Sequence, residues 1–231
     1  MTSAADSPRD VADMFAGIAR RYDLMNALMT LGRDQAWRRR AVAELGRCPG
    51  GLALDVGTGT GDFLPLLSAA GWHAVGLDLT AAMMQAGREK LERCDGRGAF
   101  LAGDALRLPF PDGSFDGVIN GFLLRNVADV RGALAEMRRV LRPGGRLVCL
   151  EIIWPTQPLV REAFSLHLGH LVPLLGRLIS GHEDAYSYLP RSVAAFMGAR
   201  PLAELMREVG LAEVRCRRLA LGCIALHRGR K

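Results

Sequence analysis

The chain has 231 residues, of which 49% are hydrophobic, and this size and composition are typical of one globular domain with a well-developed core. Its net charge is +6, but 28 of the 30 basic residues are arginines spread along the whole chain, so the charge indicates either an anionic partner or a bias in composition. The sequence has no uncharged apolar stretch of about 18 residues, which excludes a membrane-spanning helix.

The predicted elements are first helices, then alternating strands and helices, then a closing pair of strands. Residues 1–8 are small and polar and are expected to be disordered, whereas 9–231 should form a single domain that begins with a helical cap over 9–47. Strands are predicted at 52–56, 73–77, 99–102, 117–120 and 146–152, with helices at 61–70, 80–94 and 129–141. A Leu-rich helical insertion over 155–185, a helix over 193–209 and strands at 213–219 and 222–227 complete the chain.

This order of elements predicts an α/β fold with a doubly wound, mostly parallel sheet of seven strands. The connection between the last two strands is too short for a parallel crossover, so the last strand should be antiparallel. The helical cap precedes the first strand, and we expect it to lie over the carboxyl ends of the strands, where ligands bind in such sheets. Within the cap, residues 38–40 are expected to form a solvated, arginine-rich helix face.

The most informative stretch is 54–62, in which an apolar strand runs into a turn with three glycines and then into a helix. The glycines allow a sharp turn and let a ligand approach the main chain closely. Asp78 ends the next strand, 21 residues after Gly57, which is the spacing of a carboxylate that binds ribose hydroxyls. Asp62 stands where a dinucleotide site needs Gly or Ala and should repel phosphate, so the pattern favours a nucleoside without a pyrophosphate, such as S-adenosylmethionine. The alternative is a tight turn with no ligand.

Three acidic residues, Asp55, Asp78 and Asp104, end the first three predicted strands. Parallel strands present their carboxyl ends at one edge of a sheet, so these side chains should share a cleft. We expect Asp78 to accept hydrogen bonds from both ribose hydroxyls and Asp104 from the adenine amino group. Asp55 should hold the turn and lie near the sulfonium. Capping of the following helix is the alternative role for any one of the three.

Several motifs give the chain a clear resemblance to a known family from residue 11 to the end. They are Tyr22-Asp23-Leu24-Met25-Asn26, the glycine turn, Gly103-Asp104-Ala105, Leu124-Arg125-Asn126-Val127 and Arg142-Pro143-Gly144-Gly145. On these residues the sequence resembles the ubiquinone/menaquinone C-methyltransferase family. Many methyltransferases share the glycine turn and the Arg-Pro-Gly-Gly motif, whereas the Tyr-Asp-x-Met-Asn and Leu-Arg-Asn-Val motifs are particular to this family.

The resemblance implies a Rossmann-like class I methyltransferase with S-adenosylmethionine as the methyl donor. Together with the strand-end pattern, it indicates the cofactor-binding residues Asp55, Gly57, Gly59, Thr60, Asp78, Leu79, Asp104, Ala105 and Gly121. It also implies methylation of a ring carbon of a polyprenyl quinol at the membrane surface, with demethylmenaquinol as the leading acceptor. The chain departs from the family pattern at Asp34, Thr58, Leu123 and Ile153. Leu123 and Ile153 are expected to line the acceptor site, which leaves another small phenolic acceptor as the alternative.

Methyl transfer to a ring carbon needs an electron-rich phenolate held in line with the methyl group. Arg125 is the candidate to stabilise the phenolate charge, Asn126 to orient a hydroxyl or a water, and Tyr22 to relay the proton. The structural alternatives are a surface arginine, a loop-capping asparagine and a core tyrosine. No metal is expected, because His167 and His170 lack a further ligand at suitable spacing.

The leucines of the predicted insertion over 155–185 either line a tunnel for a prenyl tail, meet a bilayer, or pack within the protein or a homodimer. The expected partners are therefore a lipophilic quinol and, in the second and third cases, a membrane surface or another copy of the chain. No interleaving of aromatic and basic residues points to nucleic acid. The polar start without an apolar signal region, and five cysteines without a Cys-x-x-Cys pair, favour a cytoplasmic location, in which the membrane case places the protein at the inner face.

Overall fold

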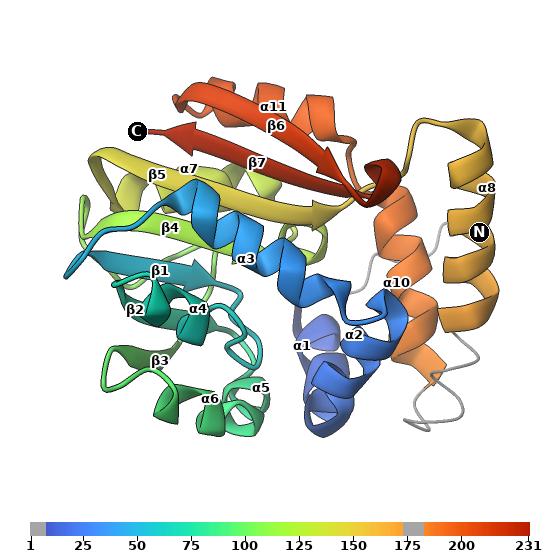
Figure 1. Cartoon of the computed structure of the whole chain (residues 1–231), viewed down its shortest axis with the longest axis horizontal. Helices are drawn as coiled ribbons and strands as arrows, with labels where there is room; N and C mark the ends of the chain where they lie inside the picture. The colour runs from blue at the N-terminus through green and yellow to red at the C-terminus, as the bar shows by residue number, and fades with distance from the viewer. Residues whose placement is uncertain (1–7, 173–182) are drawn as a thin grey trace.

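The predicted strands form one sheet at the centre of the molecule (Figure 1). The computed structural model describes residues 8–172 and 183–231, and within them the sheet has seven strands in the order β3-β2-β1-β4-β5-β7-β6. The strands are β1 (Leu52–Val56), β2 (His73–Asp78), β3 (Gly98–Ala102), β4 (Phe115–Gly121), β5 (Leu141–Ile152), β6 (Ala212–Leu219) and β7 (Ile224–Arg230). Neighbouring strands from β3 to β5 are parallel, whereas β7 is antiparallel to both β5 and β6. The predicted sheet, with its antiparallel last strand, is confirmed.

Helices cover both faces of this sheet. They are α1 (Pro8–Ile18), η1 (Ala19–Arg21), α2 (Tyr22–Thr30), α3 (Arg33–Leu45), α4 (Leu64–Ala69), α5 (Ala81–Ala86), α6 (Arg88–Glu92), η2 (Leu124–Asn126), α7 (Val130–Val140), α8 (Pro158–Leu166), the π-helix η3 (His167–Leu171), α10 (Glu183–Ala195), α11 (Ala199–Glu208) and η4 (Ala220–Gly222). In β1, Ala53 packs into a buried cluster with α3 and α4, and Leu54 packs into another with α7 and α11. Strands buried on both faces need apolar residues at successive positions, which is why continuous apolar runs predicted them.

Helices α1 and α2 lie beyond the carboxyl ends of the central strands, next to α10 (Figure 1). Ile18 and Met25 pack there against Leu168 of η3 and Val193 of α10. Helix α3 differs from the prediction of a cap over 9–47, because it buries Ala41, Val42 and Leu45 against the sheet. The cap is therefore formed by α1, η1 and α2. Residues 1–7, where disorder was predicted, lie outside the described part of the chain, and Pro8 begins α1.

The predicted helix over 80–94 is divided into α5 and α6 at Gly87. A Cβ atom at this position would lie only 1.9 Å from the carbonyl oxygen of Thr60, so the absent side chain lets the helix pair approach the glycine turn. Thr80 precedes α5 as predicted, but its side chain makes no capping hydrogen bond. This close approach decides which side chains of α6 can reach the turn.

Other boundaries also differ from the prediction. The helix expected over 193–209 is divided into α10 and α11 by residues 196–198, and β5 begins at Leu141 instead of Arg146. Phe115 of β4 pairs with Leu141 of β5, and Gly117 pairs with Arg146. The pairing is therefore irregular over residues 142–145 of β5, which contain the Pro-Gly-Gly sequence. Part of the predicted helical insertion, 173–182, lies outside the described residues. None of the described helices is both long and apolar enough to cross a bilayer.

Candidate active site

The glycine turn connects β1 to α4 at the carboxyl edge of the sheet. The backbone φ angles of Gly57, Gly59 and Gly61 are +70°, +56° and +81°, which are left-handed values that favour glycine. The amide of Gly57 donates to the carbonyl of Leu77 in β2 over 2.8 Å, so the turn is fixed against the neighbouring strand. A Cβ at Gly57 would lie 2.6 Å from Leu123, and the bare backbone therefore forms one wall of the space above the sheet.

A cleft of about 140 Å³ lies over this edge. Most of the residues predicted to bind the cofactor line it, namely Gly57, Gly59, Asp78, Leu79, Asp104, Ala105 and Gly121. The two oxygens of the Asp78 carboxylate accept hydrogen bonds from the amides of Gly59, at 2.7 Å, and Thr80, at 2.8 Å. Each oxygen keeps a second lone pair, so the carboxylate can also accept from ribose hydroxyls. Burial raises the pKa of Asp78 above its ordinary value, against the lowering effect of hydrogen bonds that include these two.

The opposite wall of the cleft comes from the cap, which was predicted to lie over this edge, but the contribution of α1 to the lining was not predicted. Val11, Ala12 and Phe15 of α1 line the cleft together with Tyr22 of α2. Their helical spacing in the sequence is that of any amphipathic helix, so it gave no sign that this apolar face would meet a ligand. Only the path of the cap over the carboxyl ends of the strands brings these residues to the cleft.

Two of the predicted cofactor-binding residues, Asp55 and Thr60, do not line the cleft. Asp55 is fully buried beneath the turn, where its Oδ2 accepts a hydrogen bond of 2.6 Å from Thr58 Oγ1. This burial raises the pKa of Asp55 to about 7. The residue therefore holds the turn, as expected, but does not present its charge to a bound sulfonium. Thr60 instead turns its hydroxyl towards Asp23 and Lys90.

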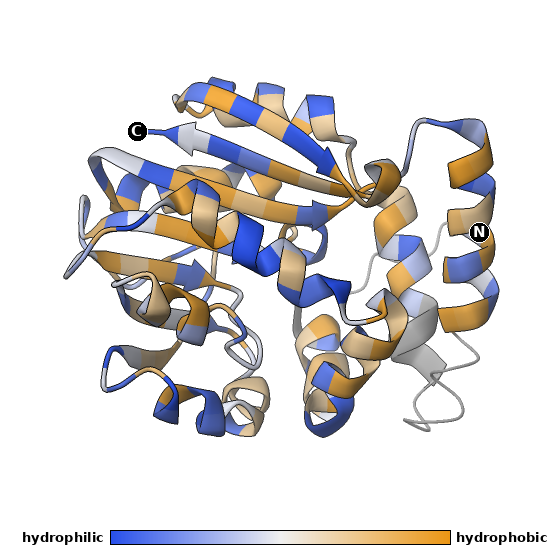
Figure 2. Ribbon diagram, in the orientation of Figure 1, coloured by the Kyte–Doolittle hydropathy of each residue, from blue (hydrophilic) through white to orange (hydrophobic). Residues whose placement is uncertain are grey.

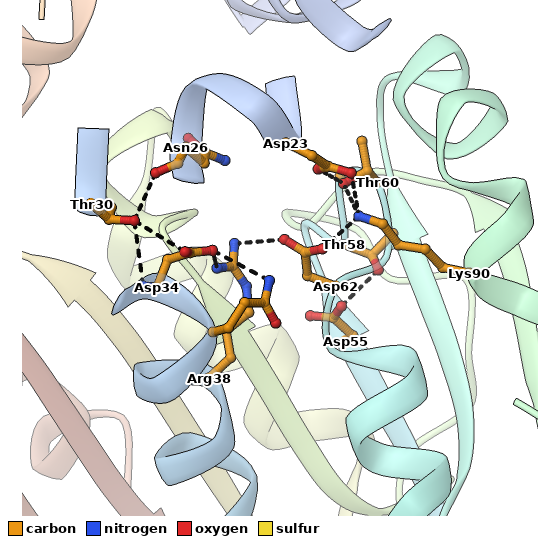
Figure 3. A network of polar contacts seen from close by, with 12 residues as sticks. Asp23, Asn26, Thr30, Asp34, Arg38, Asp55, Thr58, Thr60, Asp62 and Lys90 are labelled. Atoms are coloured by element: carbon orange, nitrogen blue, oxygen red, sulfur yellow. Dashed lines mark hydrogen bonds and ion pairs between the residues drawn. The ribbon is translucent and has the colours of Figure 1, made fainter. Parts of the chain in front are cut away.

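Asp62 lies within a buried ionic network and does not face the cleft (Figure 3). Arg38 Nη2 lies 3.1 Å from one of its oxygens, and Lys90 Nζ lies 2.5 Å from the other. Burial alone would raise the pKa of Asp62, but the two cations outweigh it and hold this pKa below its ordinary value. Repulsion of phosphate by Asp62 was therefore a wrong reason for excluding a pyrophosphate, because its charge is compensated.

Arg38 is likewise not on a solvated face, as the arginine run had suggested. Its side chain is only 6% exposed and also pairs with Asp34 at 2.6 Å. The guanidinium carbon lies 5.3 Å from the ring centre of Phe122 and 5.8 Å from that of Phe63. Arg39 and Arg40 are exposed, so only one member of the run is buried. A run of three arginines could not reveal which one would face inward.

A second cavity, of about 440 Å³, lies beside the cleft. Apolar side chains form most of its lining, including Met29, Trp37, Ile152, Phe164 and Leu168, and Arg33, Arg125 and His167 are its basic members. Tyr22 and Phe122 line both the cleft and this cavity. Phe122 has a φ of +61°, an uncommon value for a large residue, so its ring is held between the two spaces by a strained backbone.

Of the three predicted catalytic residues, Tyr22 lies between the two spaces, Arg125 lines the cavity and Asn126 lines the cleft. Arg125 Nη1 donates to Glu151 Oε1 at 2.7 Å and to the carbonyl of Phe122 at 2.6 Å. Its buried Nε has no hydrogen-bond partner among the described residues. The Asn126 amide is already engaged, since it donates to the same carbonyl at 3.2 Å and accepts from Tyr188 at 3.1 Å.

Leu123 and Ile153 were expected to line the acceptor site, and neither lines the apolar cavity. Leu123 instead lies against the glycine turn and lines the cleft. Ile153 is buried in a small cluster with Ala199 and Ala225. Asp34, the third departure, is a buried member of the ionic network. The departures from the family pattern therefore lie outside the cavity, and the acceptor argument that was based on them does not hold.

Comparison with known proteins shows the family to which the chain belongs. All of residues 1–231 match the model of the ubiE/COQ5 methyltransferase family. The chain belongs to this family. It is 46% identical over 225 residues to a demethylmenaquinone methyltransferase of Roseiflexus castenholzii, covering 96% of this chain and 93% of that protein. It is 42% identical over 224 residues to the ubiquinone/menaquinone biosynthesis C-methyltransferase UbiE of Desulfotalea psychrophila, covering 96% and 90%.

Solved structures of lower identity share the fold. The putative methyltransferase in a complex with the Haloferax volcanii Trm112 activator has a TM-score of 0.68 at 21% identity, covering 99% of both chains. A SAM-dependent methyltransferase from Aquifex aeolicus has a TM-score of 0.64 at 18% identity, covering 90% of this chain and 97% of the other. The predicted family and fold are confirmed, and with them the enzyme class, a methyltransferase. S-adenosylmethionine is the donor that the cleft fits, with its narrow glycine wall, its ribose-binding carboxylate and its apolar cap.

The buried Asp55 predicts a specific pH dependence of stability. The folded protein keeps a proton on Asp55 between its ordinary pKa of 3.8 and about 7, where the unfolded chain has lost it, so this residue makes the free energy of unfolding fall as the pH rises through that window. Asp55→Asn removes the titration. The free energy of unfolding of the variant, relative to the native protein, should therefore rise by up to about 4 kcal/mol across the window.

Urea unfolding between pH 5 and pH 8 covers the upper part of this window and should show about 2–3 kcal/mol of the difference. Asp13→Asn is the matched control, because Asp13 is an exposed residue of α1. If native protein and Asp55→Asn gave parallel curves of stability against pH, the proposed protonation of Asp55 would be wrong.

Proposed function

We propose that this enzyme transfers a methyl group from S-adenosylmethionine to a ring carbon of demethylmenaquinol, giving menaquinol. The observation that carries the proposal is the apolar cavity of about 440 Å³ that meets the donor cleft at Tyr22 and Phe122. A lipophilic ring fits such a cavity, and the shared wall brings it next to the donor. Relatives named demethylmenaquinone methyltransferase at 40–46% identity support the choice of acceptor.

The donor supplies an electrophilic methyl group, and the chain must supply the geometry and the charge. Loss of a hydroxyl proton from the quinol raises the electron density at the adjacent ring carbon, so stabilising the phenolate lowers the barrier. Arg125 lies in the cavity wall, its Nε–H has no partner in the part of the chain that the structure describes, and its Nη1 is held by the buried Glu151. Arg33 adds a second cation to the lining. Tyr22, at the boundary between cleft and cavity, is placed to relay the proton.

Asn126 has a different role in this arrangement from the one that the sequence indicated. Its side chain connects the loop after β4 to Tyr188 of α10. We propose that it positions Arg125, since both side chains donate to the carbonyl of Phe122. Leu123 and Ile153 do not line the cavity, so these two departures give no support to a small phenol without a lipid tail.

The proposed acceptor is tested with chemically reduced quinones and mass spectrometry of the products. We expect methylated naphthoquinol from reduced demethylmenaquinone, with a higher kcat/KM than for a demethylated benzoquinol or a simple phenol. The oxidised quinone should not react, because it lacks the hydroxyl that activates the ring carbon. Equal or faster methylation of a small phenol without a prenyl tail would overturn the assignment.

The role of Arg125 is tested by Arg125→Lys, which keeps a positive charge near Glu151 but removes Nε and the planar guanidinium. We expect kcat to fall by about 10²-fold, the loss typical of one donor to a developing oxyanion, while the affinity for the donor stays unchanged. Steady-state kinetics and calorimetry with S-adenosylmethionine measure the two effects. Arg131→Lys, at an exposed ion pair with Glu208, is the control. A kcat within a few-fold of the native value would remove Arg125 from the mechanism.

We also propose that the cavity opens towards a lipid surface. Leu31 lines it and is 86% exposed, and Leu221, at 79%, lies between the lining residues Ala220 and Cys223. Leu159 of α8, the helix that contributes Phe164 to the lining, is 80% exposed. Figure 2 shows apolar residues along both α2 and α8, at the end of the molecule beyond the strands. A prenyl tail has little affinity for water, and exposed leucines around the cavity allow it to pass from a bilayer to the site.

This contact predicts that Leu159→Ser combined with Leu221→Ser weakens binding to vesicles of anionic lipid by at least about five-fold, because two exposed apolar side chains are lost from the contact. Co-sedimentation measures the binding. Leu101→Ser, at an exposed leucine of β3 on the far side of the sheet, is the control. Activity towards a short-tailed, water-soluble quinol should not change. Undiminished co-sedimentation of the double variant would contradict the contact.

A further inference from the structure

The ionic network beneath the glycine turn extends to the cap (Figure 3). Lys90 of α6 lies 2.7 Å from Asp23, the second residue of α2. The hydroxyl of Thr60 donates to the other oxygen of Asp23 over 2.6 Å and accepts from Lys90 over 2.8 Å. One side chain of the cap therefore bonds both to the cofactor turn and to the helix behind it.

The members of the network differ sharply in exposure. The side chains of Asp34 and Arg38 are 6% exposed, those of Asp62 and Lys90 are 13% and 17% exposed, and that of Asp23 is 47% exposed. The four inner groups are two anions and two cations, so they balance one another without Asp23. Detaching Asp23 leaves no net charge buried, and its carboxylate can be hydrated. The outer contact is therefore reversible, whereas breaking the inner one would strand a buried charge.

Asp23 belongs to the part of the chain that covers the donor cleft. Tyr22, its neighbour, lines the cleft together with Val11, Ala12 and Phe15 of α1. A donor seated between these residues and Asp78 is covered by the cap on one side, so movement of the cap away from the cleft would widen its path in and out.

The cap is connected to α3 by two residues with an unusual backbone conformation. Between α2 and α3, Leu31 and Gly32 both have left-handed backbones, with φ of +51° and +70°. Apart from Gly32 and its chain neighbours, no atom of residues 8–172 and 183–231 lies within 4 Å of the place where a Cβ of Gly32 would be, so the glycine serves the backbone conformation and not close packing. Helix α3 is packed against the sheet, so a change at these two residues would move α1 and α2 relative to the cleft.

We propose that Asp23, Thr60 and Lys90 form a latch that holds the cap closed over the bound donor. Opening of the latch sets the rate at which S-adenosylmethionine and its demethylated product exchange, and its closure holds Tyr22 between donor and acceptor. Asp23 and Lys90 are positioning residues, since they act through the cap. The latch rests on the proposed function for the identity of the donor and not for that of the acceptor.

The test is the dissociation rate of S-adenosylhomocysteine from the full-length protein, measured by stopped flow without any acceptor. Asp23→Asn should release it at least about five-fold faster, because the ion pair with Lys90 is lost. Asp23→Glu should retain part of the closure. Asp13→Asn removes the same charge from an exposed position on α1 and should release the product at the native rate. Added salt should speed release from the native protein towards the rate of Asp23→Asn, because Asp23 is half exposed.

A double-mutant cycle separates a latch from a simple effect on helix α2, whose first turn Asp23 also occupies. If the latch exists, adding Thr60→Val, which removes the other partner of Asp23 and leaves the Lys90–Asp62 pair intact, to Asp23→Asn speeds release little further. If Asp23 only stabilises its helix, the two effects add, and the proposal is overturned. Equal release rates for Asp23→Asn and native protein would overturn it too. Hydrogen exchange of α1 and α2 in the native protein, with and without S-adenosylhomocysteine, gives a reading independent of any variant, and unchanged protection of the cap would also contradict the latch.

Discussion

The site depends on how two carboxylates of the glycine turn are buried without leaving uncompensated charge. Asp55 sits under the turn, bonded to Thr58, and burial raises its pKa to about 7. Asp62 stays ionised because Arg38 and Lys90 compensate it from two sides. Since a buried charge without a partner is strongly destabilising, the fold requires both cations to lie next to Asp62. The turn thereby fixes the placement of α3, which carries Arg38, and of α6, which carries Lys90.

The compensation of Asp62 by Arg38 also connects the donor site to the acceptor site. Arg38 faces Asp62 with its guanidinium nitrogens and also lies against the ring of Phe122. The Phe122 carbonyl in turn accepts from Arg125, whose guanidinium carbon lies 6.0 Å from the Phe122 ring centre. Phe122 thus stands between an arginine of the donor side and one of the acceptor side. A ring held in this way keeps the two spaces apart while letting them meet at Tyr22.

A lipophilic acceptor explains why the two spaces are so different. The donor cleft is small and polar at the carboxyl ends of the strands, where backbone amides and carboxylates recognise an adenosyl group. The larger cavity is built mainly from α2, α3, α8 and η3, outside the sheet, and its side chains are mostly apolar. Family membership accounts for the methyl transfer, and the cavity accounts for a substrate with a hydrocarbon tail.

The sequence by itself determined the fold and the donor edge, because both depend on local patterns. Apolar runs located the strands to within a few residues, and the glycine turn with Asp78 located the cleft, since the carboxyl ends of parallel strands must meet at one edge. The Leu-Arg-Asn-Val motif brought Arg125 into consideration through the family resemblance.

Tertiary structure alone decided which charges are buried. The pairing of Asp62 does not follow from spacing, because Arg38 and Lys90 lie 24 and 28 residues away from it and reach it only through packing. The packing of the helices around the sheet also places the apolar face of α1 in the wall of the cleft. It leaves Leu123 and Ile153 outside the cavity, and neither result follows from local sequence patterns.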